Sequence, residues 1–352
     1  MTVKVLIVDD SAFMRNAIKN MLSSDPEIKV IATARDGVEA VEKTELFKPD
    51  VITMDVEMPR MDGIEALRLI MDKSPTPVIM VSSITTEGAE VTLDALDYGA
   101  VDFIPKNLSE LSINIVKIKE MLIEKVKLIA GSSVVRKHRI IGPATHAGMQ
   151  TRRIVPALST GERRISVVAI GTSTGGPRAI QEIIPHLPKD FPTPIVIVQH
   201  MPPNFTGPFA ERLNDLSQIT VKEAEEGEPL RVGVALVAPG RGHMRVSRPR
   251  GIETVVNISE NREEFIYRPS VDYLMQSMSE FFPGRALGVI LTGMGNDGVK
   301  GITSMKQTGC RIFAQNEETC VVYGMPRAVI DAGIADKVLP IEDMAGEIIN
   351  AV

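Results

Sequence analysis

The sequence predicts an α/β protein of two doubly wound domains, each built on a mainly parallel sheet. The chain of 352 residues is long enough for two domains. Short β-branched runs alternate with helical periodicity on both sides of a segment that lacks periodicity. The net charge of −6 is also divided unevenly, because residues 1–122 sum to −8, residues 123–164 to +7 and residues 165–352 to −5. A short basic segment therefore separates two acidic ones.

The N-terminal domain is expected to contain five strands. The first, Val3–Val8, is an almost continuous apolar run of the kind that parallel sheets bury. Ser11 is placed to cap the next helix, whose apolar side chains fall on one face. The other strand candidates, separated by helical patterns, are Lys29–Ala32, Val51–Met54, Pro77–Val81 and Val101–Ile104. We assign residues 1–122 to this five-stranded parallel domain.

Residues 123–164 are expected to be an interdomain linker. From Gly131 to Arg153, Gly, Ser and basic residues are frequent and no amphipathic stripe is present. The basic run Arg136–Arg139 is a candidate nucleic-acid patch, but no aromatic residues interleave with it. The pattern favours a solvated tether between two acidic domains.

The alternation of strands and helices resumes at Ile165 and predicts a second α/β domain over residues 165–352. Its strand candidates are Ile165–Ile170, Pro194–Val198, Val234–Ala238, Ala286–Leu291 and Arg311–Ala314. The run Thr254–Ile258 is a candidate arm of an antiparallel hairpin.

Cysteine content and hydropathy indicate a cytoplasmic protein. Cys310 and Cys320 form no C-x-x-C motif, which favours reduced thiols, with a single disulfide as the alternative. The N-terminal apolar run reaches Asp9 and Asp10 at once, unlike a signal peptide. No apolar stretch approaches the ~20 residues that a membrane helix needs, so we expect a protein that is not inserted in a membrane. The negative net charge also gives no reason to expect nucleic-acid binding.

Polar side chains gather where the first domain's strands end. In parallel α/β folds these carboxyl ends meet at one edge of the sheet and bind ligands. Three carboxylates together suit Mg²⁺, while a lysine and a hydroxyl facing them would stabilise the oxygens of a phosphoryl group transferred to one carboxylate. The residues at these ends are Asp9, Asp10, Asp55, Ser82, Ser83 and Lys106.

These residues, together with Glu57-Met58-Pro59 and Met61-Asp62-Gly63, make residues 1–122 resemble a response-regulator receiver domain. The resemblance implies a flavodoxin-like fold with Asp55 as phosphoacceptor and Phe103 as an aromatic switch. It also implies that Ser82 and Lys106 bind the phosphoryl oxygens. The implied Mg²⁺ ligands are Asp9 through water, Asp10, Asp55 and the backbone carbonyl of Glu57. Receivers usually place proline directly after the lysine, whereas here Asn107 follows Lys106 and Pro105 precedes it.

A second constellation surrounds Ser173. The turn Gly171–Pro177 follows a strand and precedes a helix, so its Gly-x-Ser-x-Gly pattern can present the serine hydroxyl beside helix N–H groups that favour an oxyanion. It lacks the lysine of a P-loop and the G-x-G-x-x-G of a Rossmann site. A serine nucleophile needs a base, and His200 ends the next strand, with His243 as the rival. Asp297, in the glycine-rich loop Thr292–Gly298, is the candidate orienting acid, because geometry rather than chain order defines a triad. The other histidines lie in the linker, His138 and His146, or in a helical stretch, His186.

Residues 165–350 resemble the catalytic domain of the chemotaxis receptor methylesterases, the CheB family. The motifs that carry the resemblance are Gly171–Pro177, Gln199–Pro202, Ala238–Met244, Arg268–Asp272, Thr292–Gly298 and Gly324–Pro326. It implies a Rossmann-like α/β hydrolytic domain in which Ser173 is the nucleophile, His200 the general base and acid, and Asp297 the orienting acid. Thr174 and Met294 would line this site, which needs no cofactor.

The two resemblances together imply a phosphorylation-activated protein-glutamate methylesterase. Its substrates would be glutamyl methyl esters on methyl-accepting chemotaxis receptors, hydrolysed to glutamate and methanol, with deamidation of receptor glutamines as a second activity. The receiver would inhibit the esterase site until a chemotaxis histidine kinase, the phosphodonor, phosphorylates it.

Two other classes of function stay open from the sequence. A non-catalytic response regulator would use its second domain to bind a protein, but would not need a serine, a histidine and an aspartate at three strand ends. A DNA-binding regulator would need a basic output domain, whereas residues 165–352 carry a net −5 and show no evident helix-turn-helix.

Overall fold

The computed structural model describes residues 2–83, 85–106, 115–131, 164–249, 253–260, 265 and 267–352. The chain folds into two units, Met1–Gly142 and Pro143–Val352. Residues 123–130 of the predicted linker are helical and end α5, while residues 132–163, with the basic run Arg136–Arg139, lie outside the described residues. None of the described helices has the length and apolar character of a membrane-spanning segment.

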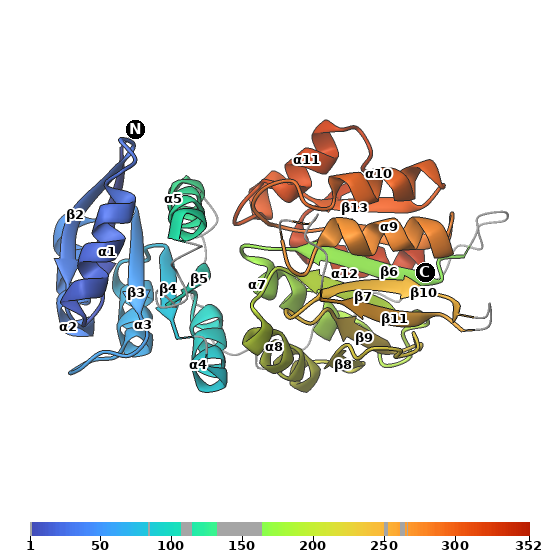
Figure 1. Ribbon diagram of the computed structural model, residues 1–352, viewed down its shortest axis with the longest axis horizontal. Helices are drawn as coiled ribbons and strands as arrows, with labels where there is room; N and C mark the ends of the chain where they lie inside the picture. Colours follow the sequence, from blue (N-terminus) through green and yellow to red (C-terminus); the bar gives the residue numbers. More distant parts are fainter. Residues whose placement is uncertain are drawn as a thin grey trace. The chain divides into compact units, whose positions relative to one another are not determined.

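The first unit is a five-stranded parallel sheet between two layers of helices, as predicted (Figure 1). Its strands are β1 (Val3–Val8), β2 (Ile28–Ala34), β3 (Val51–Asp55), β4 (Val78–Ser82) and β5 (Asp102–Pro105), in the order β2-β1-β3-β4-β5. Its helices are α1 (Ala12–Leu22), α2 (Gly37–Phe47), α3 (Gly63–Lys73), α4 (Thr86–Asp97) and α5 (Ile115–Ala130). Helix α1 packs with α5, and α3 packs with α2 and α4, so the two groups cover opposite faces.

Local sequence explains why α1 begins and packs where it does. The Ser11 side chain accepts a hydrogen bond from the N–H of Met14, which satisfies one of the free donors of the first turn. Ile18, Met21 and Leu22 are buried, and they belong to the apolar face that the sequence predicted. The helix therefore follows directly from the strand end that carries Asp9 and Asp10.

Seven of the described strands of the second unit form one sheet with the order β14-β13-β12-β6-β7-β9-β8, paired in parallel throughout. They are β6 (Val167–Thr172), β7 (Ile195–Gln199), β8 (Thr220–Glu223), β9 (Val234–Val237), β12 (Ala286–Ile290), β13 (Arg311–Gln315) and β14 (Lys337–Leu339). A separate antiparallel hairpin joins β10 (His243–Ser247) to β11 (Val255–Ser259), and β11 overlaps the predicted hairpin arm Thr254–Ile258 except at Thr254.

The strands β6, β7 and β12 are buried along their whole length, because helices cover both faces of this sheet. The helices are α7 (Gly176–Gln181), α8 (Pro203–Leu216), α9 (Val271–Phe281), α10 (Val299–Gln307), α11 (Met325–Asp331) and α12 (Ile341–Ala351). Helix α10 packs with α9 and α11, and α7 packs with α8. Cys310 and Cys320 are both free and buried, in line with the expectation of reduced thiols.

Candidate functional site

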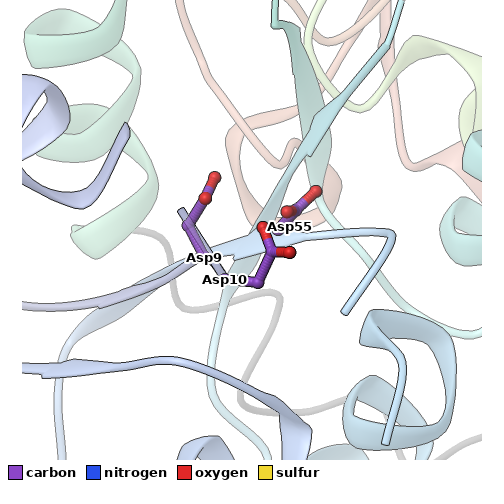
Figure 2. A group of neighbouring side chains, drawn as sticks. All are labelled: Asp9, Asp10 and Asp55. Carbon is purple, nitrogen blue, oxygen red and sulfur yellow. The ribbon is translucent and has the colours of Figure 1, made fainter. Parts of the chain in front are cut away.

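In the first unit the predicted acidic residues meet at the edge between β1 and β3. The chain leaves β1 for β2 on one side and returns to β3 on the other, so this edge is the switch point where ligands collect in such folds. Asp9 and Asp10 follow β1 and Asp55 ends β3, and Figure 2 shows the three side chains gathered there. One carboxylate oxygen from each lies within 4.8 Å of the others.

Lys106 offsets part of the negative charge of this cluster. Its Nζ lies 2.5 Å from Asp55 Oδ2 and 3.4 Å from Asp9 Oδ2. Burial raises the pKa of Asp55 to about 6, and the neighbouring Asp9 charge adds to this rise, although Lys106 lowers it. Burial likewise raises the pKa of Asp9. Two buried carboxylates with raised pKa values indicate a site that one lysine leaves short of positive charge.

The donor set fits Mg²⁺. All three side chains offer oxygen, which this cation prefers, and Asp10 is exposed, so bound water could complete an octahedral shell. The raised pKa of Asp55 has the same implication, since a cation here would stabilise its ionised form.

A glycine fixes the loop that follows β3. Helix α3 begins at Gly63, where a Cβ would lie only 2.0 Å from the Asp55 carbonyl oxygen. The N–H of Gly63 also donates to the carbonyl of Val56 at 2.9 Å. Asp62 caps the helix by accepting from the N–H of Glu65. The Met61-Asp62-Gly63 motif thus brings the start of α3 against the backbone of Asp55.

The hydroxyl of Ser82 is turned toward α4 in this structure. Ser82 Oγ lies 3.2 Å from the carbonyl of Gly88 and accepts a 2.7 Å hydrogen bond from Thr92 Oγ1. The residue itself ends β4, the strand next to β3, as predicted. Its side chain therefore reaches the acidic cluster only after these bonds change.

Three further predicted members of this site are in the described chain. The N–H of Glu57 lies 3.4 Å from Asp55 Oδ1. Phe103 is buried in β5. The reversed order Pro105-Lys106 still brings the lysine to Asp55, with its N–H bonded to the Ser82 carbonyl at 2.6 Å, while Asn107 lies outside the described residues.

In the second unit, the serine, histidine and aspartate follow three neighbouring strands. Ser173 comes directly after β6, His200 after β7 and Asp297 in the loop after β12, and β6 lies between the other two. This is the switch point of the second sheet, because the chain proceeds from β6 to β7 on one side and from β12 to β13 on the other.

The backbone of Ser173 is held from both sides. Its N–H donates to the Thr292 carbonyl at 3.1 Å, and its carbonyl accepts from Gln199 Nε2 at 2.9 Å. The turn then passes through Gly175, whose φ of 77° lies in the left-handed region that glycine favours. Thr292 adds a second tie, since its Oγ1 donates to the Thr174 carbonyl at 3.0 Å.

His200 and Asp297 are in direct contact. His200 Nε2 lies 2.8 Å from Asp297 Oδ2, and both side chains are largely buried. Burial alone would raise the pKa of Asp297, but the hydrogen bond and charge of His200, with backbone N–H donors, outweigh it and lower that pKa. The ionised carboxylate can only accept hydrogen bonds, so Nε2 is the donor of this contact.

Asp297 sits at the N-terminus of α9. Its carboxylate accepts from the N–H of Val271 at 2.7 Å, the N–H of Asp272 at 3.0 Å and the hydroxyl of Ser270 at 3.0 Å. The first N–H groups of a helix have no partner within the helix and carry positive partial charge, which stabilises an anion. The acid is therefore held in one orientation by three groups besides the histidine.

The two residues predicted to line the site, Thr174 and Met294, lie near Ser173, but a hydrogen bond between Ser173 and His200 is missing from the described contacts. Thr174, which follows Ser173, and Met294 are both buried. Gly293, the residue before Met294, lies against the serine, because a Cβ added at Gly293 would be 2.9 Å from the Ser173 Cβ. Among the described contacts, no hydrogen bond joins the Ser173 hydroxyl to His200. Catalytic hydrogen bonds are often long before substrate binds and shorten in the substrate complex.

The rival histidine has a different environment. His243 begins β10, is wholly buried and packs against the rings of Phe265 and Tyr273, with centroids 5.5 and 5.8 Å away. A substrate in solution cannot reach a side chain enclosed in this way.

Several groups that shape the site were not anticipated as site residues. Ser270 could have been found from its position before a helical pattern, since serine is a preferred N-cap. The hydrogen bond of Thr292 to Thr174 and the ring contact of Tyr267 leave no local signal in the sequence, because they join segments far apart in the chain.

Comparisons with known proteins identify both units. The family described as CheB methylesterase matches residues 168–348, and that described as response regulator receiver domain matches residues 5–115. A protein of Oleidesulfovibrio alaskensis named protein-glutamate methylesterase/protein-glutamine glutaminase 1 is 52% identical over 367 aligned positions, covering 99% of each chain. A protein-glutamate methylesterase/protein-glutamine glutaminase of Pyrococcus abyssi is 45% identical, covering 99% of this chain and 94% of that one.

A solved structure supports the fold of the second unit. The crystal structure of the Thermotoga maritima CheB methylesterase catalytic domain matches with a TM-score of 0.52 and 44% sequence identity. The match covers 54% of this chain and 100% of that one.

Proposed function

Because the chain belongs to the CheB methylesterase family and carries a receiver domain, we propose that it is a phosphorylation-activated protein-glutamate methylesterase. Its substrates are glutamyl methyl esters on methyl-accepting chemotaxis receptors, which it hydrolyses in the cytoplasm to glutamate and methanol. The observation that carries the chemistry is the 2.8 Å contact between His200 and Asp297 at the sheet edge where Ser173 lies. The full-length similarity to proteins named methylesterase and glutaminase carries the substrate class.

Hydrolysis proceeds through an acyl-enzyme. Ser173 Oγ attacks the ester carbonyl while His200 takes the serine proton, and the tetrahedral intermediate collapses as His200 returns that proton to the leaving methoxide. Water then attacks the acyl-serine, with His200 again as base, and releases the glutamate carboxylate and free serine. Asp297 stays ionised throughout and stabilises the imidazolium.

The ring nitrogen that exchanges the proton is Nδ1. Nε2 is bonded to Asp297, and Nδ1 is a buried atom with no hydrogen-bond partner in the described part of the chain. Rotation of the Ser173 side chain supplies that partner when substrate enters. This is the reverse of the commonest triad, in which the acid holds Nδ1 and the serine faces Nε2.

Thr174 and Met294 line the reacting carbonyl, and the backbone N–H of Met294 is a donor for the oxyanion. Two glycines flank Met294, and the left-handed φ of Gly295, 78°, sets the turn there. A glutamine side chain presents the same carbonyl with ammonia as leaving group, so receptor deamidation uses the same steps. No metal takes part in these steps.

The receiver controls this reaction through Asp55. A chemotaxis histidine kinase transfers a phosphoryl group to its carboxylate, and the unphosphorylated receiver inhibits the esterase. Lys106, already 2.5 Å from Asp55, pairs with the phosphoryl oxygens. Asp9, Asp10, Asp55 and the Glu57 carbonyl would hold Mg²⁺, which supplies neutralisation of the phosphoryl charge.

Ser82 links the phosphoryl group to α4. To donate to a phosphoryl oxygen, its hydroxyl must leave the Gly88 carbonyl and Thr92 Oγ1. Phosphorylation thereby changes the contacts of β4 with the first turns of α4, and this is the step by which Asp55 alters the receiver surface.

Methanol release by two variants tests the two parts of the proposal. Ser173→Ala should abolish methanol release while Asp55 still accepts phosphate, and near-normal turnover would refute the nucleophile. Asp55→Asn should keep basal release but lose stimulation by a small-molecule phosphodonor. Stimulation that persists in that variant would refute the regulatory role.

A further inference from the structure

Tyr267 lies face to face with the histidine of the candidate triad. The ring centroids of Tyr267 and His200 are 4.6 Å apart and the ring planes differ by 6°. Offset stacking at this separation is one of the preferred arrangements of aromatic rings. The imidazole therefore has a flat apolar surface against one of its faces.

The other end of Tyr267 rests on the loop that carries Asp297. A Cβ on Gly295 would lie 2.9 Å from the Tyr267 hydroxyl, so the absence of a side chain at Gly295 gives the phenol ring its place. Tyr267 thus spans from the histidine to the aspartate loop.

The residues that follow Tyr267 hold the acid. Ser270, Val271 and Asp272 donate hydrogen bonds to the Asp297 carboxylate. One short segment, residues 267–272, therefore contacts both members of the acid–base pair. The sequence singled out most of this segment, Arg268–Asp272, without giving it a role.

The histidine needs a second constraint besides its hydrogen bond. The bond to Asp297 fixes the position of Nε2, but a single hydrogen bond does not fix the imidazole plane, on which the direction of Nδ1 depends. A face contact restricts the tilt of this plane. Building on the function proposed above, we infer that Tyr267 is a positioning residue whose ring holds the imidazole plane of His200 so that Nδ1 can accept the Ser173 proton when substrate binds.

Two substitutions separate the ring from the hydroxyl. Tyr267→Phe keeps the stacked ring and should keep turnover close to that of the native chain. Tyr267→Leu removes the flat face and should lower kcat for methanol release about two- to tenfold with little change in KM, because the loss falls on proton transfer and not on substrate binding. The rate at which a fluorophosphonate modifies Ser173 should fall by a similar factor in the leucine variant alone.

The experiment uses the full chain, with melting temperature as the check on folding. Turnover of Tyr267→Leu equal to that of the native chain would overturn the positioning role, as would a phenylalanine variant as slow as the leucine variant. If the leucine variant does not fold, Tyr267→Met takes its place with the same expectations. A parallel Ser173→Ala arm separates the two proposals. If that variant stays active, the proposed function fails. If it is inactive while Tyr267→Leu is unimpaired, only the role of Tyr267 fails.

Discussion

Replacing Asp297 with asparagine is the most informative single change at the esterase site. The carboxylate accepts two hydrogen bonds on each oxygen: Oδ2 from His200 Nε2 and the N–H of Val271, Oδ1 from Ser270 Oγ and the N–H of Asp272. An amide keeps only one accepting oxygen. In either orientation its NH₂ group faces a backbone N–H at the start of α9 that cannot turn away.

The size of the effect follows from these contacts. A buried donor left without an acceptor costs about 1–3 kcal/mol, so Asp297→Asn should lower the free energy of unfolding by about that amount. If the NH₂ group faces His200, Nε2 must give up its proton and Nδ1 must carry it, which removes the base. A wrong tautomer of this kind lowers kcat about 10⁴-fold in Ser-His-Asp hydrolases.

Methanol release from methylated receptor membranes and thermal melting measure the two effects. Asp272→Asn is the matched control, because this buried acid also lies in the first turn of α9 but its side chain accepts from the N–H of Gly301 at 2.8 Å. Burial raises the pKa of Asp272, so a neutral side chain is tolerated there and turnover should fall far less. Turnover of Asp297→Asn within about tenfold of the native chain would refute the role of the acid.

Three further predictions concern the receiver and the linker. The raised pKa of Asp55, about 6, means that its ionisation should reduce the stability of the metal-free receiver by up to about 3 kcal/mol as pH rises from about 4 to 6. Melting curves should show this loss in the native chain but not in Asp55→Asn, and Mg²⁺ should reverse it; equal pH dependence would contradict it. Thr92→Val removes a hydrogen bond that must break before Ser82 can reach a phosphoryl oxygen, so it should lower the phosphodonor concentration for half-maximal stimulation. A titration that gives the native concentration would contradict the role of Ser82. Neutralising the three linker bases, Arg136, Lys137 and Arg139, should alter basal turnover or its salt dependence, because their positive charges stand between two acidic domains in the sequence. No change in either would refute an electrostatic role of the linker.

The sequence predicted the elements whose burial is continuous. Strands such as Val51–Asp55 and Ile195–Gln199 are buried at every residue, so an apolar run identifies them. The edge strands β8 and β14 were missed, because they are short and partly exposed and so lack such a run. The linker was predicted to begin at residue 123, where the charge changes sign, but α5 continues to Ala130.

Strand ends explain how much of each site the sequence revealed. In a parallel sheet every carboxyl end lies at one edge, so Asp9, Asp55 and Lys106 could be grouped without knowing the strand order, and the structure brings them together. Side-chain direction could not be predicted in this way: the Ser82 hydroxyl is bonded to Thr92 instead. Contacts such as that of Tyr267 with His200 depend on a loop path that no periodicity encodes.

The most direct test of the central proposal is release of labelled methanol from receptor membranes that carry methyl-labelled glutamyl esters. The native chain should release the label, a phosphodonor with Mg²⁺ should increase the rate, and Ser173→Ala should release none under either condition. If the native chain leaves the label on the receptors, or if Ser173→Ala releases it at the native rate, the proposed function is contradicted.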